Sequence, residues 1–277
     1  MSTTSSPCSW LVLGRPGLSR TVFDTGFEGQ HMDASTFVGP SGRSVTAVTA
    51  DEMRDIDRVV VEEIGLDLRR MMEHAGRGLA EAVLRVRSNG RSDVPISVLA
   101  GNGGNGGGGL ACARHLANRD VPVRIVLDRA PSEVSGVTAE QLRILEAMDV
   151  TIESPDCDTD TYTALDDLVV DSLIGYGLTG APRGAAAELI ETVDGAAETI
   201  VSLDVPSGTN ATTGEAPGVA VEPDLTATLA LPKTGLATVG GDLRLVDLSI
   251  PQVVYDRLEI EYCNPFGGGF AVPLSTR

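Results

Sequence analysis

The chain has 277 residues, of which 42% are hydrophobic, and this is enough to bury one large α/β core or two small ones. Its 39 acidic and 21 basic residues give a formal net charge of −18, which argues against binding to nucleic acid or to an anionic membrane surface, since both need a basic footprint. The four cysteines are dispersed and no apolar run approaches the length of a membrane span, so we expect a reduced protein of the cytoplasm.

The basic residues are unusual in kind as well as in number. Lys233 is the only lysine of the chain, and the other basic residues are arginines. An acidic surface that almost lacks lysine favours a halophilic protein, kept soluble in concentrated salt where self-repulsion is screened. The alternative is an acidic protein of an ordinary cytosol. In both cases the charge opposes an anionic ligand, so backbone amides, a few arginines or a bound cation would have to hold a phosphate.

Organised sequence begins after a biased stretch. Residues 1–44 are rich in Ser, Thr, Gly and Pro, which predicts a disordered or loosely attached extension. Thr49 and Glu52 form a capping box that opens a helix through about Ile64, and a second helix is predicted from Asp67 to Val86. Beyond it, predicted strands alternate with predicted helices. The strands are 96–100, 122–127, 150–153, 168–171, 199–203, 225–229 and 243–247, and the helices are 110–118, 137–148 and 185–193.

This alternation predicts an α/β fold, a Rossmann-like three-layer sandwich in which a mostly parallel sheet is flanked by helices on both faces. We assign this domain to residues 45–251. The pattern fades after Pro251, so residues 252–277 are predicted to form a C-terminal tail. Ligands of such sheets bind beyond the carboxyl ends of the strands, and we expect the functional site there.

A glycine-rich run, GNGGNGGGG at residues 101–109, directly follows the predicted strand 96–100. It predicts a tight loop that leads into a helix, where bare N–H groups and the helix dipole attract a phosphate or pyrophosphate. The alternative is a purely structural turn, in which glycine serves close packing.

Two aspartates close predicted strands beside further glycine-containing loops. Asp171 precedes IGYGLTG at 174–180, and Asp204 precedes VPSG at 205–208. Carboxylates at these strand ends can hold a cation, accept hydrogen bonds from a ribose or transfer protons. Each could instead cap a loop or the next helix.

Six motifs occur in order between Val48 and Pro251. They are MMEHAG at 71–76, the glycine run with ARHL at 113–116, VVDSLIGYGLTGAPRG at 169–184, LDVPSG at 203–208, PKTGL at 232–236 and VDLSIP at 246–251. As an ordered set they resemble the YjeF N-terminal domain family, the NAD(P)H-hydrate epimerases of nicotinamide cofactor repair. The resemblance implies an isomerase that interconverts the R and S epimers of hydrated NADH and NADPH, called NADHX and NADPHX.

The resemblance also implies the site residues. Asp204 matches the family's substrate-binding acidic residue and is the expected general acid/base, while Asn105, Asp171 and Ser207 match its ligands of a potassium ion. Hard oxygen ligands suit such a cation, which would offset the repulsion between an acidic protein and an anionic dinucleotide. The residues expected to line the substrate are Gly104, Asn105, Gly106, Gly107, Gly108, Gly175, Tyr176, Gly177, Leu178, Thr179, Gly180, Ala181 and Asp204.

The chain departs from the family's usual motifs in the glycine loop, in the MMEHAG segment and after PSG, where the family's acidic stretch has become Thr209-Asn210-Ala211-Thr212. The family's glycine loop commonly reads GPGNNGGDG, so Gly104 stands for an Asn and Gly108 for the Asp, and His74 replaces the Asn of LMENAG. These departures leave open a non-catalytic nucleotide-binding or scaffold module of the same fold. Another nucleotide-dependent enzyme such as a dehydrogenase is a third reading, which the lack of a clean GxGxxG with a downstream acidic residue disfavours.

The resemblance further implies a homodimer. In many relatives this domain is joined to a hydrate dehydratase that consumes the S epimer. Only about 26 residues follow Pro251, too few for such a domain, so we expect any dehydratase in a separate chain.

Overall fold

The computed structural model describes residues 37–88, 94–155 and 164–277. Within these ranges the strands are β1 Phe37–Val38, β2 Ser44–Val45, β3 Ile96–Ala100, β4 Val123–Leu127, β5 Thr151–Glu153, β6 Leu168–Ser172, β7 Thr199–Leu203, β8 Leu225–Leu229, β9 Asp242–Val246 and β10 Ala271–Thr276. The helices are α1 Ala50–Arg58, η1 Val59–Ile64, α2 Leu68–Ser88, α3 Gly104–Ala117, η2 Pro131–Glu133, α4 Gly136–Glu146, α5 Gly184–Ala196, η3 Thr234–Thr238 and α6 Gln252–Arg257.

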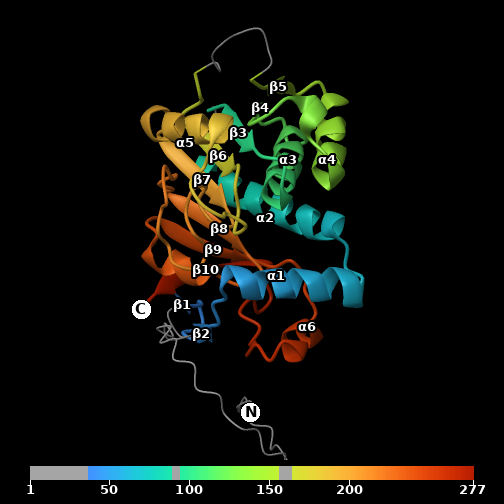
Figure 1. Ribbon diagram of the computed structural model, residues 1–277, viewed down its shortest axis with the longest axis vertical. Coiled ribbons are helices and arrows are strands. Elements are labelled where there is room, and N and C mark those ends of the chain that lie inside the picture. Colours follow the sequence, from blue (N-terminus) through green and yellow to red (C-terminus); the bar gives the residue numbers. More distant parts are fainter. Residues whose placement is uncertain (1–36, 89–93, 156–163) are drawn as a thin grey trace, which may run out of the picture. The chain divides into compact units, whose positions relative to one another are not determined.

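These strands form one sheet with the order β2-β1-β10-β9-β8-β7-β6-β3-β4-β5. Every pairing from β9 to β5 is parallel. The pairings at the other edge, among β9, β10, β1 and β2, are antiparallel. The sheet is therefore mostly parallel, as the alternation of strands and helices predicted (Figure 1).

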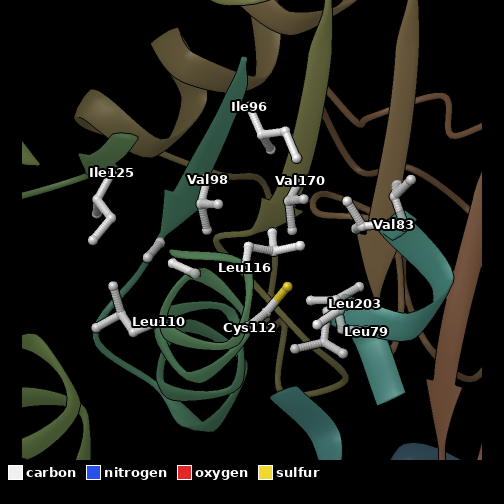
Figure 2. Packing of buried hydrophobic residues seen from close by; sticks show 14 of the residues in the cluster. Leu79, Val83, Ile96, Val98, Leu110, Cys112, Leu116, Ile125, Val170 and Leu203 are labelled. Atoms are coloured by element: carbon white, nitrogen blue, oxygen red, sulfur yellow. The ribbon is translucent and has the colours of Figure 1, made fainter. Parts of the chain in front are cut away.

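Helices cover both faces of the sheet and give it three layers. Leu79 and Cys112, on α2 and α3, belong to one buried cluster with Val98 and Val170 of the central strands, and Figure 2 shows Cys112 among these apolar side chains. On the other face α5 buries Leu189, Ile190 and Val193 against the sheet, in a second cluster distinct from the first. The predicted fold class is confirmed, and so is the burial of the strand interiors on both faces.

The first helix begins as its sequence predicted. The hydroxyl of Thr49 accepts a hydrogen bond from the backbone N–H of Glu52 at 3.2 Å, and the Glu52 carboxylate accepts one from the N–H of Thr49 at 2.7 Å. This reciprocal capping satisfies two amides that the helix itself leaves unpaired. The last turns, η1, widen to π-helical geometry before Gly65 ends the element with a φ of 80°.

The predicted C-terminal tail is wrong in its local structure. Residues 252–277 include α6 and β10, and β10 pairs with β9 in the register Leu274↔Leu243. Strand β1, placed by sequence in the loose extension 1–44, pairs with β10 and buries Phe37 completely. Residues 1–36 of that extension lie outside the described part. A two-residue strand has no periodicity to detect, which is why these edge pairings escape sequence patterns.

None of the helices in the described ranges combines the length and the hydropathy that crossing a bilayer requires.

Candidate functional site

The glycine run is helical, which corrects the predicted loop. Helix α3 begins at Gly104, six residues before its predicted start, so only the residues before it form a turn. A Cβ at Gly106 would lie 1.7 Å from the carbonyl oxygen of Gly101, and one at Gly109 would lie 1.8 Å from Oγ of Ser172. These glycines let the helix approach the strand ends, and close packing accounts for them.

The glycine at the position of the family's aspartate is also buried in this packing. A Cβ at Gly108 would lie 2.7 Å from Cδ2 of Leu203, whose side chain fills the neighbouring space. Neither Gly106, Gly107 nor Gly108 is among the residues that line the adjoining cavity. The first two residues of α3, Gly104 and Asn105, do line it, so the helix presents its amino end there.

This cavity has a volume of about 490 Å³ and lies at the carboxyl ends of the parallel strands. Helices α1 and α2 provide a wall that includes Met53, Met71 and Met72. Of the residues that sequence assigned to the substrate, those lining the cavity are Gly104, Asn105, Gly175, Tyr176, Gly177 and Asp204. The other residues assigned to the substrate do not line the cavity: Gly106, Gly107, Gly108, Leu178, Thr179, Gly180 and Ala181.

Asp204 directly follows β7 and has a left-handed backbone, with a φ of 66°. A non-glycine residue rarely holds this conformation unless its surroundings enforce it. Here the N–H of Asp204 donates to the carbonyl of Ala227 at 2.8 Å, and its Oδ1 accepts from the N–H of Leu229 at 3.1 Å. Strand β8 therefore fixes both the backbone and the carboxylate of Asp204 at the cavity.

The ammonium group of Lys233 forms an ion pair with Oδ1 of Asp204. Both side chains are almost completely buried, with 1% and 4% of their surfaces exposed. The Lys233 Nζ also donates to the carbonyl of Leu229 at 2.9 Å and lies 5.9 Å from the ring centroid of Tyr176. A buried pair of this kind needs such additional contacts, because both ions have lost their water.

Tyr176 connects this pair to helix α1. Its hydroxyl donates a hydrogen bond to Oδ2 of Asp57, a half-buried residue of α1 that also lines the cavity. Burial raises the pKa of the Asp57 carboxyl, while the Tyr176 hydroxyl and Lys233 oppose that rise. The pKa of Tyr176 is itself raised by burial and by the charge of Asp57. A continuous series of contacts thus runs from Asp57 through Tyr176 and Lys233 to Asp204.

Sequence reasoning assigned no role to Lys233 or Asp57. The sequence did single out Lys233, because it is the only lysine of the chain and lies within the motif PKTGL. The signal for Asp57 was a carboxylate among the buried apolar residues Met53 and Ile56 of α1 and Val60 of η1.

Asp171, Ser207 and Asn105 meet around the turn after β6. The hydroxyl of Ser207 donates to Oδ1 of Asp171 at 2.5 Å and its N–H to Oδ2 at 2.9 Å. The same hydroxyl accepts from the N–H of Ile174 at 2.8 Å. At the next residue, a Cβ on Gly175 would lie 3.1 Å from Oδ1 of Asn105, so glycine allows the Asn105 side chain to reach this turn.

The charges and polar atoms at this turn fit a cation. Asp171 is fully buried, and the described residues include no basic group within ion-pair distance of it. Burial accordingly raises the pKa of its carboxyl against four hydrogen bonds that lower it. Nδ2 of Asn105 is a buried atom without a partner in the described part, and amide N and O atoms are interchangeable by rotation. A cation would supply both the missing charge and the missing contact.

The chain was compared with known proteins. The family model described as YjeF-related protein N-terminus matches residues 68–235. An NAD(P)H-hydrate epimerase of Dehalogenimonas lykanthroporepellens is 45% identical over 87% of this chain and 98% of that protein. A bifunctional NAD(P)H-hydrate repair enzyme of Salinibacter ruber is 39% identical over 76% of this chain, which spans only 42% of that longer protein.

Among solved structures, a crystal structure of yeast ynu0 matches with a TM-score of 0.72. The match covers 83% of this chain and all of the yeast chain at 22% identity, which shows the same fold. From the family model and the relatives together, the chain belongs to the YjeF-related protein N-terminus family.

Proposed function

We propose that this protein is an NAD(P)H-hydrate epimerase that interconverts the R and S epimers of NADHX and NADPHX. The observation that carries the proposal is the buried Asp204–Lys233 pair at a cavity between the strand ends and the amino end of α3. Relatives named NAD(P)H-hydrate epimerase, including one that the chain matches over nearly its whole length, support it. Epimerisation is an isomerase reaction, so no second substrate or redox partner is required.

The chemistry follows from the substrate. The hydrated ring carbon bears a hydroxyl and a ring nitrogen, so its C–O bond breaks when the hydroxyl is protonated and leaves as water. The nitrogen lone pair then forms an iminium, and water adds to the opposite face of the ring. We assign Asp204 as a general acid/base for these proton transfers, because its carboxylate lines the cavity. Lys233 holds that carboxylate in place through the ion pair.

The anionic part of the substrate would lie near the amino end of α3, where backbone N–H groups and the helix dipole favour negative charge. Arg54 of α1 also lines the cavity and adds a positive charge to it. Gly175 and Gly177, in the turn after β6, line the same cavity, and the missing side chain of Gly175 lets the Asn105 side chain lie close to this turn.

Asn105, Asp171 and Ser207 would hold a potassium ion. The Ser207 hydroxyl has a second acceptor, the carbonyl of Ile174 at 3.2 Å, so it can turn away from Oδ1 of Asp171 and free that oxygen. When bound, the cation supplies a positive charge beneath the substrate site and offsets the buried charge of Asp171.

The finer features of the protein's setting are proposals as well. Cys112 and Cys263 are free thiols, which supports a reducing cytoplasmic location. The net charge of −18 and the near absence of lysine support a halophilic protein. The bifunctional relatives support a dehydratase activity that consumes the product, and the family resemblance supports a homodimer.

The experiment is a turnover assay of the purified full chain in potassium chloride. The R epimer of NADHX or NADPHX is the substrate, and an S-specific dehydratase removes the product. We expect R-hydrate loss well above the spontaneous rate, and a fall of at least about 100-fold in Asp204→Asn. Asp256→Asn, which removes an exposed carboxylate of α6, is the matched control and should keep full activity. A folded wild-type chain without turnover would favour the non-catalytic binding or scaffold module.

A further inference from the structure

We propose that Asp57 of helix α1 is a second catalytic carboxyl group, which exchanges protons with the substrate hydroxyl or water on the ring face turned away from Asp204. This inference rests on the proposed epimerase function and adds a residue to the same cavity. Inversion requires it chemically: the hydroxyl leaves from one face of the ring and water enters on the other. A single fixed carboxyl group serves one face only.

The placement of the two carboxyl groups supports this division. Asp204 belongs to the wall formed by the strand ends, at the carboxyl end of β7, whereas Asp57 belongs to the wall formed by α1. Both line the same cavity. Tyr176 and Lys233 link them through contacts, since Tyr176 donates to Asp57 and its ring centroid lies 5.9 Å from Nζ of Lys233, which is paired with Asp204.

The surroundings of the two groups suit opposite proton roles. Asp204 forms a buried ion pair with the ammonium of Lys233, and this contact suits a carboxylate that acts as the base. Asp57 forms no ion pair among the described residues, and its carboxylate accepts a hydrogen bond from the Tyr176 hydroxyl. Proton transfer at two points requires one acid and one base, and the different surroundings of Asp57 and Asp204 suit these two roles.

The reaction balances with these two groups. In one direction Asp57 gives its proton to the departing hydroxyl, the C–O bond breaks and water leaves. A second water adds to the iminium on the Asp204 face, and Asp204 takes its proton. In the reverse direction Asp204 donates and Asp57 accepts. Each turnover exchanges one hydroxyl oxygen for one from water, leaves the oxidation state of the ring unchanged, and resets by proton exchange with solvent.

The experiment follows inversion and oxygen exchange separately. Purified R and S epimers are each incubated with the full chain in ¹⁸O-labelled water, and the products are analysed by chiral chromatography and mass spectrometry. Asp57→Asn keeps the shape of the side chain and an acceptor for Tyr176. Asp55→Asn is the matched control, because Asp55 lies on the same helix but is exposed and pairs with Arg58 at 3.8 Å.

We expect Asp57→Asn to invert at least about 100-fold more slowly than the wild type, while one epimer still exchanges its oxygen with retention on the Asp204 face. Asp204→Asn should show the mirror-image result, with exchange kept by the other epimer. Asp57→Glu should recover at least about 10-fold of the lost inversion rate, because it restores a carboxyl group. A purely structural role for Asp57 would not separate exchange from inversion.

Three results would overturn the inference. Asp57→Asn that inverts as fast as the wild type would remove Asp57 from the reaction and leave the epimerase function intact. A folded Asp57→Asn that binds the hydrate but loses inversion and exchange with both epimers would show that Asp57 does not serve one face. A wild-type chain that accelerates neither process would overturn the proposed function together with the inference.

Discussion

The Nζ atom of Lys233 and Oδ1 of Asp204 form a buried ion pair at the functional cavity. Lys233 is the only lysine in a chain whose other basic residues are arginines. A compact ammonium fits the space between Asp204, the carbonyl of Leu229 and the ring of Tyr176, where a planar guanidinium would need more room. The pair therefore couples the stability of the domain to its proposed chemistry.

Replacing Lys233 by an uncharged residue should lower the stability of the folded protein. Lys233→Met leaves Asp204 buried without its counter-charge, and we expect the free energy of unfolding to fall by about 3–5 kcal/mol. Urea denaturation measures this change. The double variant Lys233→Met/Asp204→Asn should recover part of the loss, because the buried charge is then absent as well. Arg85→Met breaks an exposed pair with Glu81 and should cost less than about 1 kcal/mol. If Lys233→Met and Arg85→Met lowered the free energy of unfolding by equal amounts, the prediction would be contradicted.

The glycines of α3 should differ sharply in their tolerance of a methyl group. Gly106→Ala forces a Cβ against the backbone carbonyl of Gly101, and we expect a loss of about 3 kcal/mol or more in the free energy of unfolding. Gly104→Ala meets nothing within 4 Å and should stabilise the helix by up to about 1 kcal/mol. The two variants make the same chemical change two residues apart. Similar denaturation midpoints would show that packing does not explain the glycine run.

The parallel part of the fold was predictable because its elements carry strong local signals. Strand β3 is a short, fully buried run in which every residue but Ser97 is apolar, and Thr49 with Glu52 marks the start of α1. The start of α3 was missed because glycine is a poor helix former, and only its contacts with the strand ends make it favourable there. The edge strands were missed because their pairing joins Phe37 to Thr276, a contact that no local pattern contains.

The candidate site was predictable where residues follow strand ends. Asp171 and Asp204 both lie at carboxyl ends of neighbouring parallel strands, which the topology brings together. Asp57 and Lys233 come from a helix and a loop far from those strands in sequence. Their approach depends on how α1 packs, which includes the bridge between Val48 and Lys233. The spacing of these residues along the sequence does not indicate how the two segments pack.

Potassium should stabilise the protein beyond the general effect of salt. If Asn105, Asp171 and Ser207 hold the ion, a concentration 100 times its Kd adds about 2.7 kcal/mol to the free energy of unfolding. Because the net charge of −18 makes any salt stabilising by screening, thermal unfolding is compared in potassium and lithium chloride of equal concentration. Asp171→Asn should abolish the difference between the two salts. A difference that persists in this variant would place the ion elsewhere.

Stability should also fall as the pH is lowered through the range of histidine. Burial lowers the pKa of His115 from its ordinary 6.5, although Glu73, 2.8 Å from Nε2, opposes the shift. The unfolded chain therefore binds a proton below pH 6.5 that the native protein takes up only at lower pH, so stability is lost as the pH falls through 6.5. His115→Gln should flatten this part of the curve of urea midpoint against pH. His74→Gln, on α2, is the control, and an unchanged slope in His115→Gln would refute the assignment.

The pH dependence of turnover should report Asp57 and its hydrogen bond to Tyr176. Burial raises the pKa of Asp57 above its ordinary 3.8, and the Tyr176 hydroxyl lowers it. In the direction in which Asp57 donates a proton, kcat/KM falls as the pH rises through this pKa, because the donor form is lost. Tyr176→Phe removes the lowering contact, so the falling limb should move to higher pH.

The opposite direction of turnover provides the internal check on that shift. The R and S epimers carry the same protons, so their equilibrium is independent of pH and kcat/KM must follow the same pH profile in both directions. Tyr176→Phe should therefore move the falling limb of the reverse reaction to higher pH by the same amount. Tyr262→Phe is the control, because Tyr262 stacks on Tyr255 with a centroid distance of 4.2 Å and does not line the cavity. A falling limb that stays at the wild-type pH in Tyr176→Phe would show that this hydrogen bond does not set the pKa of the proton donor.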